Sequence, residues 1–512
     1  MRHAVMCSRP RTSWFALAAL SVVAAASPAV AQEAAHPELP SLEQLLDDFD
    51  NGALTLDDLR RLGLSVFTTP FNTHDGFGDG PFDPGETDTR RPGQRATLQG
   101  NGKLLRVNGL DAQSCNECHT IVSHRTRPPT LGIGGVGGVV TNAFIMGSLL
   151  DLADSADDRM LLQPGHEPEL PLEPDGVADF NGRFANPPFL FGGGGVELLA
   201  KEMTADLQRL LGEARQAAPG TVTRLLTHGT DFGSIRTVDA AGSVELQVEG
   251  IGPEDRSAAP PEEVLVVRPF GRKGEAFSMR DFDRAAMEFH FGIEPVEVVG
   301  EGIDRDGDGL VNEVTVAEMS MLHLFDVTNP PPFMERLDAE GTAGFETFIA
   351  IGCAACHHPE KVTDSRYLPL ATPEVATRPF DNVYFEVDLT RFGFRSGPRV
   401  RRRDGERGVT VSLFSDLKRH EMGPGLAETF EYGDIPNDEF ITARLWGVAD
   451  TAPYLHDGRA TTLVEAIELH GGEAQTARDA FVALGEAPRR GLFEFLGSLR
   501  TPVAPNAELL DR

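Results

Sequence analysis

Two short stretches of the sequence repeat one spacing of residues that can do chemistry. Each has two cysteines separated by two residues, with a histidine directly after the second cysteine. The N-terminal frame, in "QSCNECHT", is Cys115, Cys118 and His119, and the C-terminal frame, in "AIGCAACHHPE", is Cys353, Cys356 and His357. The chain has only 5 cysteines, so four of them lie in these two frames.

Three kinds of site use paired cysteines, and they differ in whether the histidine has a role. A zinc site of four thiolates has no need of the histidine after each pair. A thioredoxin-like dithiol needs one pair near a βαβ pattern, and two unrelated copies argue against it. Attachment of c-type haem uses every residue, because the sulfurs add to the vinyl groups and the adjacent histidine becomes the proximal iron ligand. The sequence therefore predicts two covalently bound haem c groups, with His119 and His357 as iron ligands.

The N-terminal residues are typical of an export signal. Arg2, Arg9 and Arg11 precede the apolar run "WFALAALSVVAAA", and small residues up to Ala31 offer a cleavage site. An uncleaved membrane anchor is the alternative. Cleavage leaves four cysteines, all in the two frames, and no stable membrane insertion. Since thioether attachment takes place outside the cytoplasm, we expect a periplasmic protein.

The charge of the chain limits its partners. The formal net charge is −32, and removal of the three signal arginines would make it more negative still. Such a surface repels nucleic acid and anionic membranes and attracts a cationic protein partner. The alternative is that the acidity only keeps a secreted protein in solution.

The remaining sequence is typical of helices joined by long loops. Helices are predicted for "PSLEQLLDDFDNG" and "LTLDDLRRLGL", each closed by Gly, and for "VELLAKEMTADLQRLLGEARQ", "SMRDFDRAAMEFHFG" and "AEGTAGFETFIAIG". Residues 221–270 alternate as strands do. We predict a mainly α fold with long loops, two tandem c-type cytochrome domains and a minor β insertion in the first. The predicted parts are a signal peptide (1–31), an N-terminal haem domain (32–300), a linker (301–330) and a C-terminal haem domain (331–512).

The linker contains a candidate calcium loop, "DRDGDGLVNEVT". Its alternating carboxylates are those of Asp304, Asp306 and Asp308, followed by Gly309. This is the first half of a calcium-binding loop. The twelfth position is Thr315, so a bidentate carboxylate would have to come from Glu313 or Glu318. An exposed Asp-Gly turn is the alternative.

The C-terminal third resembles the dihaem cytochrome c peroxidase superfamily, and most closely its branch of dihaem oxidoreductases or putative peroxidases, also labelled thiol oxidoreductase-like. The resemblance rests on "IGCAACHHP", "HEMGPGLAE" and "TARLWGVADTAPYLHDGRATTLVEAIELHGGEA", and more loosely on "FGRKGE" and "DGFGDGPF". It implies that a small cytochrome or cupredoxin donates electrons to the C-terminal haem, and that the N-terminal haem reduces peroxide or a related oxidant. The alternatives are a dihaem oxygenase or protein-modifying oxidase, and a non-catalytic electron-transfer cytochrome.

The resemblance also implies roles for residues beside the C-terminal haem. His470 matches the position of the sixth iron ligand; a helix-terminal histidine is the ordinary reading, and Met422 is the rival ligand. Arg459 lies with His456 in the "HDGR" turn and would pair with a haem propionate, unless it is only a surface arginine.

Beside the N-terminal haem the superfamily places a catalytic glutamate after a Pro-rich segment. Here "NPPFLFGGGGVELL" makes Glu197 the candidate acid, although an acid in a first helical turn is ordinary. His124 and His290 are alternatives as base or sixth ligand. The "FWDGR" element of classical peroxidases is absent, and Trp446 is either part of the electron path or a core residue. Relatives hold calcium between the haem domains, where the Asp-rich loop is predicted to lie.

Overall fold

The computed structural model describes residues 34–72, 74–76, 114–120, 135–136, 143–146, 182–188, 190–252, 259–397, 407–428 and 435–510. The predicted signal peptide and His124 lie outside these residues. Ala34–Arg512 form one compact unit. No helix in the described ranges is long and apolar enough to cross a membrane.

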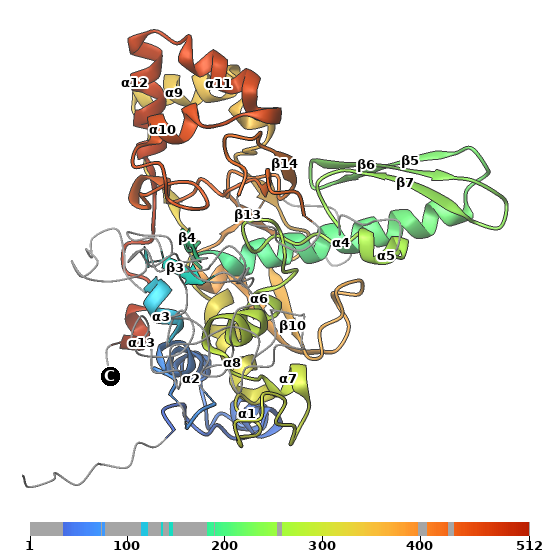
Figure 1. Ribbon diagram of the computed structural model, residues 1–512, viewed down its shortest axis with the longest axis vertical. Helices are drawn as coiled ribbons and strands as arrows, with labels where there is room; N and C mark the ends of the chain where they lie inside the picture. Colours follow the sequence, from blue (N-terminus) through green and yellow to red (C-terminus); the bar gives the residue numbers. More distant parts are fainter. Residues whose placement is uncertain are drawn as a thin grey trace, which may run out of the picture. The chain divides into compact units, whose positions relative to one another are not determined.

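Helices make up the larger part of the regular structure (Figure 1). Before the C-terminal frame they are α1 (Leu42–Asp50), α2 (Leu56–Thr68), α3 (Cys115–Cys118), α4 (Gly193–Gln216), α5 (Pro261–Val264), α6 (Met279–Ala286), the π-helical turn η2 (Met287–Phe291), α7 (Val296–Val299), α8 (Val316–Val327) and α9 (Ala339–Ala350). After it they are α10 (Leu463–Glu468), α11 (Gln475–Val482), α12 (Glu486–Gly497) and α13 (Ala507–Leu510), with the 3₁₀ turns η3 (Cys353–Ala355), η4 (Leu389–Phe392), η5 (Val448–Asp450) and η6 (Gly472–Ala474).

The strands form small sheets of two or three members. Strands β5 (Val222–Thr227), β6 (Thr230–Thr237) and β7 (Val244–Val248) make an antiparallel sheet within the region of predicted alternation. The other sheets pair β1 (His119–Thr120) with β2 (Gly135–Val136), β3 (Ala143–Met146) with β4 (Gly182–Ala185), β10 (Tyr367–Ala371) with β11 (Val383–Asp388), β14 (Arg419–Glu421) with β15 (Glu439–Ile441), β16 (Leu499–Arg500) with β8 (Phe333–Met334), and β13 (Val409–Val411) with both β12 (Arg395–Ser396) and β9 (Lys361–Val362). The fold is therefore mixed, with more helix than strand, and strands also occur in the C-terminal part. The two tandem cytochrome domains stay a prediction.

Side-chain caps fix where several helices begin. At α2, α8 and α10 a threonine accepts from the third residue of the helix, whose carboxylate accepts from the threonine amide in return. This capping box satisfies two amides that would otherwise lack partners. At α8 the pair is Thr315 and Glu318, with the Glu318 carboxylate 2.7 Å from the Thr315 amide. Glu318, one of the two glutamates considered for calcium, is thus engaged in starting a helix.

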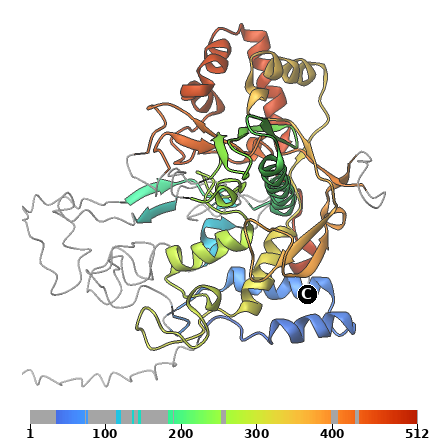
Figure 2. The ribbon, with the colours of Figure 1, turned by 90° about the vertical axis from the view of Figure 1, so that its right-hand side faces the viewer.

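Gly63 does not end α2, as the sequence suggested, because the helix continues to Thr68. A Cβ atom at Gly63 would lie 2.0 Å from the carbonyl oxygen of Met321 in α8. The glycine therefore allows α2 and α8 to pack closely, as the blue and yellow helices in Figure 2 do. A helical glycine can serve as a close-packing position as well as a terminator.

Helix α4 lies in the main hydrophobic core. Its side chains from Val196 to Leu211 include several with no exposed surface, among them Leu199, Met203 and Leu207. The same core cluster extends from Leu45 to Trp446, so it draws on residues on both sides of the predicted linker.

Four glycines open α4. Gly192 precedes the helix with φ +77° and packs against Trp446, where an added Cβ would lie 2.6 Å from the ring. A Cβ at Gly194 or Gly195 would lie 2.3 Å from the Val327 carbonyl oxygen or from the Phe394 ring, respectively. The start of this helix is therefore held by close backbone contacts.

Helix α9 leads directly into the C-terminal frame, as predicted, and packs against α12 (Figure 1). The crossing depends on Gly344, where a Cβ would lie 1.7 Å from the Gly491 carbonyl oxygen. After α9 the chain turns at Gly352, with φ +96°, into η3, which carries Cys353.

Candidate functional site

The C-terminal frame is built on a single turn. Cys353 and Cys356 are free thiols, and the amide of His357 donates to the Cys353 carbonyl at 3.0 Å. The Nδ1 atom of His357 lies 3.1 Å from the Phe414 carbonyl oxygen. A carbonyl accepts only, so Nδ1 carries the proton and Nε2 keeps its lone pair for an iron.

An apolar and aromatic cluster surrounds this frame. It contains Phe348, Phe414, Phe481 and Phe495 as buried members, with Cys353, Tyr454, Leu463 and Ile467 packed against it. The rings of Phe348 and His357 lie 6.5 Å apart. Burial, and then the neighbouring His470, lower the pKa of His357 to about 4, so the ring is neutral at physiological pH as an iron ligand must be.

His470 follows α10 and has the same tautomer as His357. Its Nδ1 atom lies 2.8 Å from the Ala466 carbonyl oxygen, which again leaves Nε2 available, and burial lowers its pKa. Among the neighbouring side chains, His470 has the largest effect on the pKa of His357. The structure therefore brings the two histidines close together, and ligation by His470 stays a prediction.

His456 of the "HDGR" turn and Met422, the rival ligand, have different surroundings. His456 stacks on Phe440, with ring centroids 4.4 Å apart. Met422 is partly buried beside the glycines that follow His470: a Cβ at Gly471 would lie 2.9 Å from the Met422 carbonyl oxygen. These glycines therefore make room for the Met422 loop.

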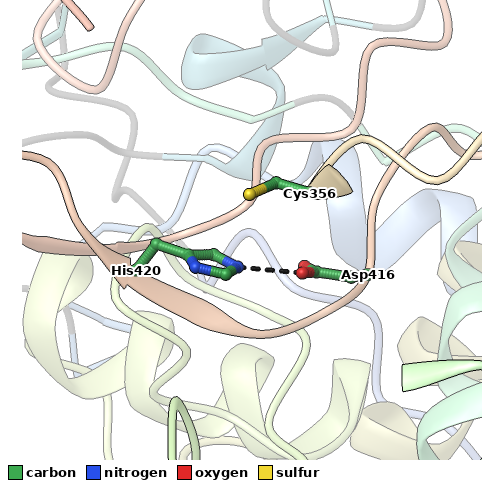
Figure 3. A group of neighbouring side chains, drawn as sticks. All are labelled: Cys356, Asp416 and His420. Carbon is green, nitrogen blue, oxygen red and sulfur yellow. Dashed lines mark hydrogen bonds and ion pairs between the residues drawn. The ribbon is translucent and has the colours of Figure 1, made fainter. Parts of the chain in front are cut away.

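Cys356 also has a charged neighbour that the sequence motifs did not reveal. Figure 3 shows His420 and Asp416 beside its sulfur, with His420 Nε2 2.8 Å from an Asp416 oxygen. The other ring nitrogen lies 2.7 Å from Glu473. Although burial opposes it, hydrogen bonding to Asp416, Cys356 and Glu473 raises the pKa of His420 to about 11. A protonated imidazole therefore lies next to this end of the frame.

Arg459 lies in the predicted turn and is exposed. Its Nε donates to Asp457 at 2.5 Å and one Nη donates to the Gly425 carbonyl at 2.9 Å. Its predicted contact with a haem propionate stays a prediction.

The two cysteines of the N-terminal frame begin and end α3, which follows Ser114, and His119 comes directly after the helix. Burial, and then the neighbouring His290 in η2, lower the pKa of His119 to about 4, while a hydrogen bond with the Pro188 backbone opposes the shift. His290, one of the two alternatives considered from the sequence, is therefore near His119. Single π-helical turns of this kind are frequent at functional sites.

A pair of buried aspartates lies next to the same frame. Asp283 on α6 and Asp326 on α8 each have one oxygen with no hydrogen-bond partner among the described residues. Burial and their mutual repulsion raise the pKa of Asp283 well above its usual range, and burial does the same for Asp326. Both aspartates, after burial, raise the pKa of Cys115, which places them near its sulfur.

Glu197 is engaged in a closed ionic network. Its carboxylate lies 2.8 Å from Lys201 Nζ and 3.0 Å from His323 Nε2, and it accepts the Met279 amide at 2.9 Å. It has no exposed surface, and although burial opposes it, Lys201 and His323 hold the pKa of this carboxyl far below its usual range. Its role as a catalytic acid stays a prediction.

The sequence offered a weak signal for the residues that it missed. His323 and Asp326 stand in "MSMLHLFDV", a helix whose other side chains are nearly all apolar, and every residue from Ala317 to Val327 is buried. A charged residue that is buried all round requires a partner. Asp416 lies in the loop before β14 and His420 lies in β14, and neither has such a pattern around it.

The Asp-rich loop brings its carboxylates together. Ligand oxygens of Asp304, Asp306 and Asp308 lie within 4.8 Å of one another, and Asp306 shares a second group of this kind with Glu294 and Glu313. Burial, and then Asp308, raise the pKa of Asp306 to about 7. Burial is also the main cause that raises the pKa of Glu313 to about 9. Carboxyls grouped at this spacing fit a hard cation such as calcium, whose binding stays a prediction.

Trp446 is a residue of the main hydrophobic core. It is 2 % exposed, packs on Gly192, and its indole nitrogen has no hydrogen-bond partner among the described residues. The segment before Gly192 is tied to the "HDGR" turn, because the Asn186 side chain donates to the carbonyls of Pro453 (2.7 Å) and Leu455 (3.1 Å).

The residues of both frames fit covalent haem. Each offers two cysteines on one turn and a partly buried histidine with a lowered pKa, and the C-terminal histidine has its tautomer fixed by a backbone carbonyl. The apolar cluster around His357 provides surroundings for a porphyrin.

Comparison with known proteins gives one family match. The family model described as "Di-haem oxidoreductase, putative peroxidase" matches residues 404–499. No curated protein matches the chain. The chain is also similar to two solved structures, hydrazine synthase from Kuenenia stuttgartiensis (16% identity, 59% of this chain and 86% of that chain, TM-score 0.25) and a MauG-like protein associated with microbial copper homeostasis (14%, 60% and 89%, TM-score 0.23). At these TM-scores neither similarity supports an argument about function.

The matched region contains His420, Met422, Arg459 and His470. A di-haem family implies haem cofactors, in agreement with the chemistry of the two frames. Residues 404–499 therefore match the di-haem oxidoreductase family model, in the part of the chain whose motifs predicted this resemblance.

Proposed function

We propose that the protein is an exported, periplasmic dihaem c-type oxidoreductase of peroxidase type. In this proposal both haems are covalently bound, and electrons pass from a small redox protein through the C-terminal haem to the N-terminal haem, where peroxide or a related oxidant is reduced. Haem, when bound, supplies an iron that changes its oxidation state by one electron.

The observation that carries this proposal is the pairing of His357 with His470. In both rings Nδ1 donates a hydrogen bond to a backbone carbonyl, so both Nε2 atoms are available to bind iron. The two rings are also close enough to interact. Two imidazole ligands would leave this iron closed to substrate and at low potential. Such a centre is suited to electron transfer, which leaves the reaction with oxidant to the N-terminal frame.

Peroxide reduction requires protons at the N-terminal frame. Asp283 and Asp326 are buried side by side near Cys115, and burial together with like charge keeps a proton on the pair at neutral pH. We infer that this pair, rather than the ion-paired Glu197 alone, is the proton store of this frame. A protonated carboxyl held close to a reacting group serves as a general acid.

The electron donor is inferred from charge. The formal net charge of −32 favours encounter with a cationic partner. We propose a basic cytochrome or cupredoxin as the donor, with contact near the C-terminal frame.

A second function is favoured by one observation. His290 lies near His119, and if it binds the N-terminal iron, both haems are six-coordinate. The protein would then be an electron-transfer cytochrome without a substrate site.

The electronic spectrum of the ferric protein separates the two functions. The haem content after denaturation is measured first, and we expect two covalently bound groups per chain. A high-spin band, together with peroxide-dependent oxidation of a reduced basic cytochrome, is expected for the peroxidase-type enzyme. Wholly low-spin iron with no turnover would show that the protein is an electron-transfer cytochrome instead. A preparation with zinc and no haem would refute both proposed functions.

A further inference from the structure

A histidine at the tip of a hairpin points into a pair of carboxylates away from the two haem frames. His228 and Gly229 form the two-residue turn between β5 and β6, with φ of +43° and +78°. Two consecutive positive φ values are typical of a type I′ turn, where Asn or Gly is the usual first residue. The Nδ1 atom of His228 lies 2.9 Å from the Val362 carbonyl oxygen of β9. Nδ1 therefore carries the proton, and Nε2 is left with its lone pair.

The carboxylates come from α4 and from the loop after β9. Glu202 accepts the amides of Asp364 at 2.7 Å and Ser365 at 2.9 Å, which fixes the direction of its carboxylate. His228 Nε2 lies 3.6 Å from a Glu202 oxygen and 3.8 Å from an Asp364 oxygen. The three ligand atoms lie within 4.8 Å of one another.

These distances suit a shared ion better than direct hydrogen bonds. A charge-assisted hydrogen bond from imidazole to carboxylate would have a length of about 2.7–2.9 Å. Around a tetrahedral zinc ion, with bonds of about 2.0–2.1 Å, neighbouring ligand atoms are separated by about 3.3–3.4 Å. The two distances from His228 Nε2, 3.6 Å to Glu202 and 3.8 Å to Asp364, are closer to this second value than to the first.

The surroundings also fit a metal centre with one open position. The side chains of His228 and Glu202 are 7% and 6% exposed, whereas that of Asp364 is 19% exposed. The backbone carbonyl held by Nδ1 is the usual outer partner of a metal-binding histidine. Three protein ligands and one side open to water are typical of a reactive rather than a purely structural zinc site.

We propose that Glu202, His228 and Asp364 bind one divalent transition-metal ion of the zinc type, with water as the fourth ligand. This site is distinct from the Asp-rich loop, where all the ligands are oxygen atoms that suit calcium. It also does not depend on the proposed peroxidase function, since none of its three residues belongs to a haem frame.

The test uses the full chain with both haems attached, freed of metal by a chelator and then supplied with excess calcium to fill the Asp-rich loop. Zinc is added, and binding is followed by calorimetry and by metal content after desalting. We expect one zinc ion per chain. Asp364→Asn, an isosteric change at the partly exposed ligand, and His228→Asn, which tolerates positive φ, should each weaken binding by about 100-fold or more.

The matched control is Glu245→Gln, which removes an exposed carboxylate from β7 of the same sheet and should bind zinc as the parent does. Haem spectra and urea midpoints show whether each variant is folded, and if His228→Asn does not fold, Asp364→Asn decides the question alone. A parent protein that binds no zinc in excess calcium, or a folded variant that binds zinc as tightly as the parent, would overturn the proposal.

Discussion

Replacing Glu313 by glutamine tests both the buried carboxyls and the calcium site. Glu313 is 3% exposed; one of its oxygens accepts the Glu294 amide at 2.7 Å, and the other has no partner among the described residues. Burial is the main cause that raises its pKa from 4.5 to about 9, with the charges of Asp306 and Asp308 adding to it. Without a cation, the folded protein therefore keeps this carboxyl protonated near pH 7.

The magnitude follows from the proton that the folded state retains. In the unfolded chain the carboxyl ionises above about pH 4.5, so the folded state binds one more proton and becomes less stable as pH rises. Each pH unit costs about 1.4 kcal/mol. Between pH 4.5 and pH 7 the loss is about 3 kcal/mol, and it continues until the folded pKa is reached. Glutamine does not titrate, so Glu313→Gln should remove this loss.

The assay is urea unfolding of the haem-loaded protein, in a calcium chelator and in saturating calcium. In chelator, Glu313→Gln should exceed the parent by up to about 3 kcal/mol near pH 7 and by almost nothing near pH 4.5. With free calcium at one thousand times Kd the order should reverse, because bound calcium then stabilises the parent by about 4.1 kcal/mol and the variant lacks one anionic ligand. Glu301→Gln, at an exposed position nearby, is the control. Equal stabilities of variant and parent in chelator at both pH values would refute the pKa argument, and an unchanged calcium response would refute the site.

Two further predictions concern the haem frames. His470→Met should keep a low-spin C-terminal haem and raise its reduction potential, since thioether sulfur favours ferrous iron. His470→Ala should instead open that iron to added imidazole. A His470→Ala protein with the parent's spectrum and potential would transfer the ligand role to Met422. Asp326→Asn should stabilise the protein to urea near pH 8 and not near pH 4, because the raised pKa of Asp326 makes the folded parent hold a proton that the unfolded chain releases. The same variant should slow peroxide turnover more than it changes KM, and unchanged turnover together with a parent-like pH dependence of stability would remove this aspartate from the proposed proton store.

The features that the sequence predicted depend on neighbours along the chain. Helices α1, α4 and α9 lie where their periodicity placed them, because caps and apolar spacing act within a few residues. The two cysteine–histidine frames are equally local, and their chemistry can be read without a fold.

The features that the sequence did not reveal depend on distant partners. Gly63 was expected to end a helix and instead meets Met321 of α8, a residue far along the chain. Asp283 meets Asp326, and His228 meets Glu202 and Asp364, only after folding brings separate elements together. No local pattern encodes such pairs, because their types and spacing are ordinary until burial removes water from them.

The glycines that open α4 have a consequence for how the chain can vary. Their backbone touches Trp446, Val327 and Phe394, so no side chain fits there without displacing segments that belong to both halves of the molecule. Gly212, near the other end of the same helix, has open space around it. Tolerance to substitution should therefore fall steeply along one helix, from free change at its exposed end to glycine alone at its start. This short run of glycines should therefore make the two segments that carry the cysteine–histidine frames vary together rather than independently.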